Sequence, residues 1–152
     1  MAISISCGLF AFENRTYQEV IKELSSGCNL KKENIFLTNE QGKKIKNLLD
    51  TKVSSLVLRY KNECNGNYFY VDSHIVRTLN ETVIVEVANK KASRFKIASF
   101  MEPKEYLPPQ KWLDNLVKNP QIDGLTGATL SSNALKKVMQ KVLVINKVVD
   151  DK

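Results

Sequence analysis

The chain has 152 residues, which fits a single domain. Hydrophobic residues make up 43% of the sequence, enough for a packed core, and this content excludes a chain that is disordered throughout. The formal net charge of +7 makes nucleic acid a first candidate partner. Because the lysines are spread along the chain and no nucleic-acid-binding signature occurs, we expect no nucleic acid partner. No segment is long and apolar enough to span a bilayer.

The first stretch, residues 1–15, is apolar as far as Phe12 and has no basic residue before Arg15. We interpret it as an N-terminal extension or the remnant of a secretory signal. A trimmed chain, a mis-assigned start and a first strand are the alternatives.

The three cysteines, Cys7, Cys28 and Cys64, form no Cys-x-x-Cys motif. The single histidine, His74, does not stand at metal-ligand spacing from any of them, so the sequence predicts no metal site. Cys28 and Cys64 can form a disulfide if the protein is exported. Three partly buried thiols are the favoured alternative.

Two helices are predicted in the first third of the chain, each opened by a capping box. Thr16 to Glu19 form the first box and predict a helix from about Thr16 to Ser25. Thr38 to Gln41 form the second and predict a helix to about Asp50, although Gly42 weakens it. A short apolar run, 35–37, lies between the two helices.

From Ser54 to Met101 the pattern is typical of strands joined by short turns. The predicted strands are 55–60, 68–72 with an extension to 77, 82–87, and a last one that ends near residue 100. The predicted turns are 65–67, 79–81 and 88–93. In the last strand, Phe95 and Ile97 are expected on one face and Ala98 and Phe100 on the other. Consecutive strands with short turns predict an antiparallel β-meander flanked by N-terminal and C-terminal helices, an α+β fold.

Pro108 and Pro109 can open a further helix over 110–118, in which Trp112 shares one face with other apolar residues. Asn119-Pro120 ends it. The next segment, Asp123-Gly124-Leu125-Thr126-Gly127-Ala128-Thr129, is small, polar and turn-prone. A helical pattern follows, and Ser131, Ser132 or Asn133 is expected to cap it. A tight turn that opens a helix suits an anion, above all a phosphate, because unpaired backbone N–H groups converge there.

This segment resembles the signature of a known family, the FMN-binding domain of flavin-carrying electron-transfer proteins. The family pattern is Asp-x-x-Ser/Thr-Gly-Ala-Thr followed by small hydroxylated residues, and Asp123, Thr126, Gly127, Ala128 and Thr129 match it. Members include the flavinylated subunits of the sodium-pumping NADH:quinone oxidoreductase and of the ion-translocating ferredoxin oxidoreductase. The resemblance extends through 72–78 and 102–108, blocks similar to small stand-alone members. The Gly-Leu-Trp segment that helps cover the flavin in the larger subunits is absent.

The resemblance implies a single FMN-binding domain over 16–147, with 148–152 as a C-terminal tail. It implies that FMN is attached through its phosphate to Thr129 by a separate flavin transferase. Most of the expected cofactor-binding residues belong to the motif and the residues that follow it: Asp123, Thr126, Gly127, Ala128, Thr129, Leu130, Ser131 and Ser132. The other two, His74 and Trp112, have aromatic rings that could contact the flavin. For His74, a structural role in a strand is an equal alternative. For Trp112, a place in the core is the favoured alternative.

The predicted function is that of a small electron carrier rather than of an enzyme with its own substrate, because no nucleophile–base pair or metal cluster is visible. The expected partners are the flavin transferase and a redox protein or membrane electron-transfer complex. The resemblance also implies an extracytoplasmic location. A non-redox partner-binding module of the same fold and a reversible, non-covalent FMN binder are the alternatives.

Overall fold

The computed structural model describes residues 12–50 and 53–150. Cys7 and most of the predicted N-terminal extension lie outside these residues. The elements follow one another in this order: α1 (Tyr17–Leu24), β1 (Leu30–Phe36), α2 (Asn39–Leu49), β2 (Leu56–Asn62), β3 (Tyr68–Val76), β4 (Leu79–Ala88), β5 (Lys91–Phe100), a 3-10 turn η1 (Lys104–Tyr106), α3 (Gln110–Lys118) and α4 (Thr129–Asp150). Within this part of the chain, no helix combines the length and the apolar character that a membrane span requires.

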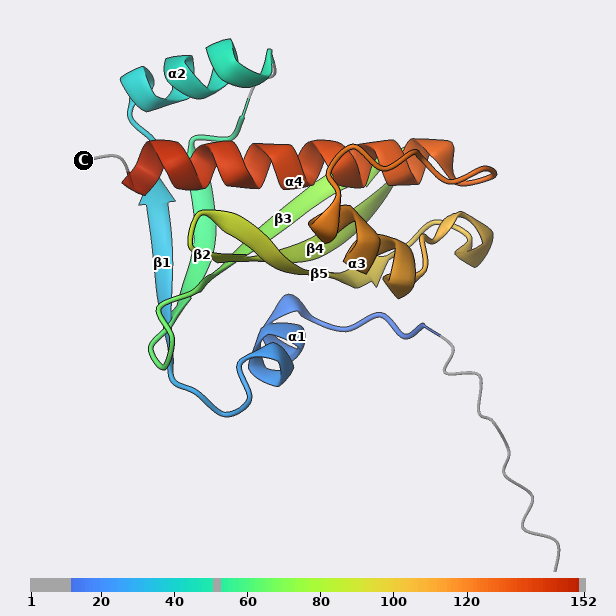
Figure 1. Cartoon of the computed structure of the whole chain (residues 1–152), viewed down its shortest axis with the longest axis horizontal. Helices are drawn as coiled ribbons and strands as arrows, with labels where there is room; N and C mark the ends of the chain where they lie inside the picture. The colour runs from blue at the N-terminus through green and yellow to red at the C-terminus, as the bar shows by residue number, and fades with distance from the viewer. Residues whose placement is uncertain (1–11, 51–52, 151–152) are drawn as a thin grey trace, which may run out of the picture.

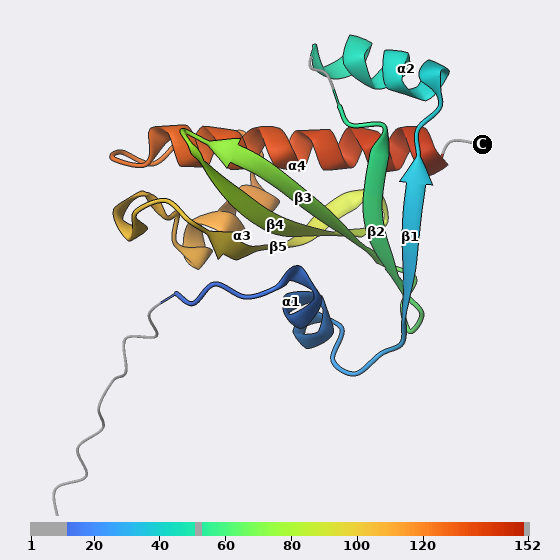
Figure 2. The same ribbon diagram turned by 180° about the vertical axis from the view of Figure 1, so that it is seen from behind.

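The five strands form one antiparallel sheet in the order β1-β2-β3-β4-β5, which confirms the predicted α+β meander. Helix α4 lies across one face of the sheet, with α3 beside its first turns (Figure 1). Helix α2 packs on the outer side of α4, and α1 covers the opposite face of the sheet (Figure 2). The larger core lies between the sheet and helices α3 and α4, and a smaller one lies under α1.

Both predicted capping boxes are present. The Thr16 hydroxyl accepts a hydrogen bond from the Glu19 N–H, and the Thr38 hydroxyl accepts one from the Gln41 N–H. In each box the side chain of the third helical residue returns to the backbone of the capping threonine. These local signals therefore predicted the starts of α1 and α2 correctly.

Strand β1 was not predicted as a strand. Its sequence, Leu-Lys-Lys-Glu-Asn-Ile-Phe, contains three charged residues, and the strand lies at the edge of the sheet. It pairs with β2 from Leu30–Asn62 to Phe36–Leu56 although α2 intervenes in the chain. An edge strand with much exposed surface carries little apolar alternation, so the pattern in the sequence is weak.

The predicted turn at 79–81 is wrong, because these residues begin β4. Val76 pairs with Leu79, which leaves Arg77 and Thr78 as the turn. Arg77 has a φ of +56°, and the Glu102 carboxylate accepts hydrogen bonds from the N–H groups of Thr78 and Leu79. The turn is thus fixed by a residue distant in sequence. The predicted turn at 88–93 also shrinks, to Asn89 and Lys90, which both have positive φ as in a two-residue hairpin.

The prediction that Phe100 faces away from Phe95 is wrong. Ser99 pairs with Thr82 and Ile97 with Val83, so Ala98 is an extra residue in β5. Such a bulge reverses the alternation of side chains beyond it. Phe100 therefore joins Phe95 and Ile97 in the larger core, while Ala98 packs in the smaller one.

Helix α4 runs from Thr129 to Asp150, which corrects two expectations about its ends. Ser131, Ser132 and Asn133 are the third to fifth residues of the helix rather than its cap. Residues 148–150 belong to the helix rather than to a tail, since Val148 is buried in the core. At this end, the buried Arg59 donates hydrogen bonds to Glu33, Tyr70 and Asp150 and so ties α4 to the sheet.

Cys28 and Cys64 form a disulfide, with their Cα atoms 5.9 Å apart. The bond joins the segment between α1 and β1 to the hairpin between β2 and β3. Beside it, the Glu63 N–H donates a hydrogen bond to the Asn29 carbonyl. The structure therefore has the pairing that the sequence reasoning ranked below free thiols.

Candidate functional site

The segment that precedes α4 forms a tight turn over Leu125, Thr126, Gly127 and Ala128. The Ala128 N–H donates to the Leu125 carbonyl at 3.0 Å, and Gly127 has a φ of +84°. A positive φ at the third position of the turn is characteristic of type II geometry, which favours glycine there. The motif glycine at 127 is therefore required by the backbone. The turn delivers the chain directly into α4 at Thr129.

Ser132 ties this turn to the first turn of α4. Its Oγ accepts a hydrogen bond from the Leu125 N–H at 3.1 Å and donates one to the Thr129 carbonyl at 3.2 Å. A Cβ atom added at Gly124 would lie 3.0 Å from this Oγ. Glycine at 124 thus allows the segment to approach the helix closely.

Two long side chains hold the segment just before the turn. The Trp112 ring nitrogen Nε1 donates to the Asp123 carbonyl at 3.2 Å, and Lys136 Nζ donates to the Ile122 carbonyl at 2.7 Å. Trp112 itself is 5% exposed and belongs to the core. The sequence analysis did not single out Lys136, since nothing local connects a helical lysine to a carbonyl fourteen residues earlier.

The hydroxyl groups of the motif differ in accessibility. Thr126 and Thr129 are exposed, whereas Ser131 is 1% exposed and Ser132 is completely buried. The Thr129 Oγ1 donates to the Leu125 carbonyl at 3.3 Å, a long contact. The threonine hydroxyl groups are therefore accessible from outside the protein, whereas the serine hydroxyl groups are not.

Thr129 is the first residue of a 22-residue helix. The N–H groups of the first turn have no partner within a helix, and the helix dipole places partial positive charge there. Side chains on a helix tilt toward its N-terminus. The start of α4 is therefore a favourable environment for an anion such as a phosphate.

Ala128 and Leu130 complete the motif on either side of Thr129. Ala128 is 6% exposed, and its carbonyl accepts the first hydrogen bond of α4, from the Ser132 N–H at 2.9 Å. Leu130 is 58% exposed. Asp123 is also exposed and contributes its carbonyl, rather than its carboxylate, to the Trp112 contact. The structure thus brings all eight motif residues predicted as site residues into one turn and the start of one helix.

His74 lies apart from this turn, on β3. Its Nδ1 contacts Asp72 and its Nε2 contacts Glu81 on β4, both at 2.9 Å. Burial lowers the pKa of His74, but the hydrogen bonds to Asp72 and Glu81 raise it further, to about 9. The imidazole is therefore charged at neutral pH, and both of its nitrogens are engaged, so it has no N–H to offer to a flavin.

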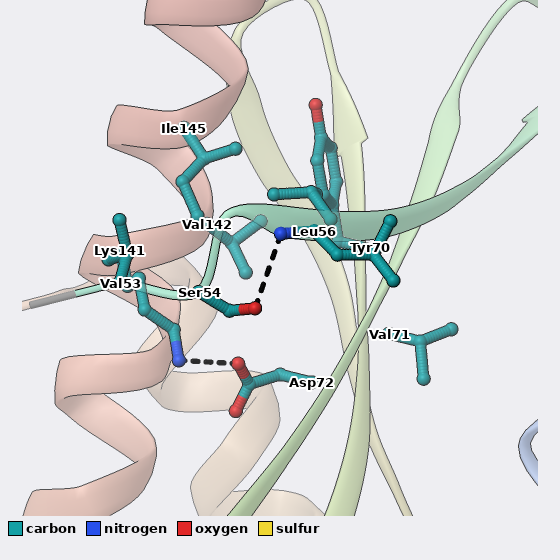
Figure 3. A pocket seen from close by; sticks show the side chains of 10 residues that line it. Val53, Ser54, Leu56, Tyr70, Val71, Asp72, Lys141, Val142 and Ile145 are labelled. Carbon is teal, nitrogen blue, oxygen red and sulfur yellow. Dashed lines mark hydrogen bonds and ion pairs between the residues drawn. The ribbon is translucent and has the colours of Figure 1, made fainter. Parts of the chain in front are cut away.

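Lys141 on α4 completes the group around His74. Its ammonium forms an ion pair with the Asp72 carboxylate, beside a small cavity of about 60 Å³ (Figure 3). Burial raises the pKa of Asp72, but His74 and Lys141 together bring it below the usual value. The alternation of Asp72 and His74 along one face of β3 could have indicated part of this cluster. The contributions of Glu81 and Lys141 depend on the tertiary fold. Among the described residues no cluster of histidine, cysteine or carboxylate side chains could hold a metal ion.

A comparison with protein families matches residues 60–144 to the model of the FMN-binding domain. The match covers more than half of the chain and includes the whole turn at 123–129. The chain belongs to the FMN-binding domain family. No curated protein and no solved structure gives a significant match. As an FMN-binding domain, the chain places its family motif at an exposed turn that opens its longest described helix, and FMN is the cofactor that this motif indicates.

Proposed function

We propose that this FMN-binding domain is a small electron carrier whose FMN is attached by a phosphoester bond to Thr129. The observation that carries the proposal is the exposed Thr129 hydroxyl at the first residue of α4. The protein supplies an anion-binding helix end, and the flavin supplies the redox chemistry. The protein contributes accessibility and fixed backbone geometry rather than catalytic groups.

The attachment reaction is assigned to a separate flavin transferase. Thr129 Oγ1 loses its proton and forms a bond to the phosphorus of an activated flavin nucleotide, whose leaving group departs in the same exchange. The proton of Oγ1 is held by one long hydrogen bond, to the Leu125 carbonyl. Loss of this hydrogen bond during the attachment reaction therefore disturbs little of the protein structure.

The disulfide between Cys28 and Cys64 supports an extracytoplasmic location, because disulfides persist in oxidising compartments. We expect the redox partner to be a protein or a membrane electron-transfer complex, since flavin can pass one or two electrons.

The test is the intact mass of the protein after co-expression with a flavin transferase in an exported form. The wild type should gain the mass of FMN less one water, and Thr129→Ala should gain nothing. Thr126→Ala is the matched control, because it removes the other exposed hydroxyl of the turn. Fragment masses of the wild type should place the added group on Thr129.

The alternatives predict other outcomes. A reversible FMN binder would be yellow but would release its colour on denaturation, with no gain in mass. A non-redox partner-binding module would stay colourless even when the transferase is shown to modify another substrate. Fragment masses that place FMN on Thr126 would overturn the assignment of Thr129.

A further inference from the structure

A cleft of about 420 Å³ lies beside the middle of α4. Its lining combines apolar side chains with charged ones of both signs: Leu49, Ala134 and Val138 are apolar, and Asp50, His74, Lys137 and Lys141 carry charge. In both views the end of α2 lies over the middle of α4 (Figures 1 and 2), and Leu49 and Asp50 at that end line the cleft. Cofactor sites combine apolar surface with a few placed polar groups, and this cleft offers apolar surface on α2 and α4 beside several charged groups.

The cleft lies farther along α4 than Thr129, about a quarter turn around the helix from it. At a rise of 1.5 Å per residue, Ala134 and Lys141 lie about 7 and 18 Å along the helix from Thr129. The ribityl chain and the three-ring system of FMN are together of comparable length. A flavin held by its phosphate at the start of α4 therefore reaches the cleft when it lies along the helix.

One stripe of α4 connects the two places. Leu130, Ala134, Lys137 and Lys141 are spaced by four, three and four residues, so they share one side of the helix. Leu130 begins this stripe, directly after Thr129, and is 58% exposed. An exposed leucine between the attachment point and the cleft gives the flavin an apolar surface to cross.

The polar side of the cleft is held rigidly. His74 is fixed between Asp72 and Glu81, and Lys141 is fixed by Asp72. Glu81 is 1% exposed, and its Oε1 has no hydrogen-bond partner in the described part of the chain. These charges balance one another, whereas Lys137 is exposed at the mouth of the cleft and no partner from this cluster engages it.

We infer that the cleft is the seat of the isoalloxazine ring. The ring lies with one face against Ala134 and Val138, and its oxygen- and nitrogen-rich edge points to Lys137. This inference rests on the proposed attachment at Thr129. It places the ring against residues of α4. The 152-residue sequence has no Gly-Leu-Trp segment, which helps cover the flavin in the larger subunits.

The first experiment uses flavinylated protein and measures the decay of flavin fluorescence anisotropy. In the wild type the ring should tumble with the whole protein. Ala134→Phe fills the cleft, so a fast local component should appear. Lys137→Ala should give a smaller component of the same kind. Lys147→Ala is the matched control, since Lys147 is an exposed lysine near the opposite end of α4. A wild-type ring that already moves freely, or an Ala134→Phe protein that behaves like the wild type, would overturn the inference.

The second experiment uses the protein without covalent flavin and adds riboflavin, which lacks the phosphate. Amide NMR signals of 134–141 and of His74 should shift, and Ala134→Phe should abolish the shifts. Shifts elsewhere, or none, would count against the cleft. The mass of each sample separates the two claims. Attachment with a freely moving ring contradicts the inference alone, whereas riboflavin shifts without attachment contradict the proposed function alone.

Discussion

His74 is the chain's single histidine, and it lies between two carboxylates on the face of the sheet that α4 covers. Sequence reasoning gave it two equal roles, a flavin contact or a strand residue satisfied by its surroundings. The structure engages both nitrogens with Asp72 and Glu81. The imidazole therefore lines the cleft beside α4 as a charged group without a free N–H.

The raised pKa of His74 predicts a pH dependence of stability. Its folded pKa of about 9 lies above the usual 6.5, so its contribution is complete below pH 6.5 and is lost as the pH rises through 9. The shift corresponds to about 3 kcal/mol, and solvent screening at this partly exposed site reduces the expected loss in the free energy of unfolding to about 2 kcal/mol. Urea unfolding at a series of pH values measures it.

His74→Gln is the control for this prediction, because it removes the titrating group and should flatten the profile between pH 6.5 and 9. The same profile in the variant as in the wild type would contradict the assignment. Asp72 has the opposite effect at acid pH, because its pKa is lowered. Its contribution to stability is complete above its usual pKa of 3.8 and is lost as the pH falls below that value.

Of the three residues expected to cap α4, it is Ser132 that ties the turn before the helix to the first helical turn. We predict that Ser132→Ala lowers the free energy of unfolding by about 1 kcal/mol, because the partly buried Leu125 N–H loses its acceptor. Hydrogen exchange of the Leu125 amide should become faster. Ser131→Ala, the neighbouring buried serine, should leave that amide unchanged. Equal exchange in Ser132→Ala and the wild type would show that the contact does not hold the turn.

Elements with a local signal were predicted well. Helix α3 begins and ends at the predicted residues, 110 and 118, because two prolines precede it and an Asn-Pro pair follows. The capping boxes located α1 and α2. By contrast, β1 pairs across an intervening helix, and the turn at Arg77 is held by Glu102 from another segment. Such tertiary interactions leave no trace in a local pattern.

The candidate site likewise has some features that the local sequence predicts and others that depend on the tertiary fold. The motif predicted the tight turn and a helix directly after it, since these follow from residues close in sequence, whereas the exposure of Thr129 is seen only in the structure. The helix starts earlier than the serines suggested, because Ala128 supplies the first helical carbonyl and Ser132 is recruited into the turn. The role of Trp112 as an anchor of the Asp123 carbonyl, and the cluster of Asp72, His74, Glu81 and Lys141, required the fold.

The disulfide is the covalent link between the two ends of a loop that contains β1, α2 and β2. For a separation of 36 residues, the loss of this cross-link should lower the free energy of unfolding by about 3 to 4 kcal/mol. Urea unfolding of a Cys28→Ser/Cys64→Ser protein, compared with the oxidised wild type, measures the difference.

The oxidised wild type, once unfolded, should show one free thiol among its three cysteines. Three free thiols from an exported sample would contradict the disulfide. Cys7→Ser is the control for the stability measurement, since it changes a cysteine that is not part of the pair. A loss of stability in that variant equal to the loss in the double variant would assign the effect to something other than the cross-link.

The two ends of α4 are secured differently. The far end is tied to the sheet through Arg59 and Asp150, and the near end carries the exposed Thr129, with about 33 Å of helix between them. Under the proposed attachment at Thr129, the flavin lies along the half of α4 that begins at Thr129, farther from Asp150. On an electrode, the current should therefore be larger when the protein is immobilised with the start of α4 toward the surface than when it is immobilised through its C-terminal side. The helix would then make the molecule a directional contact.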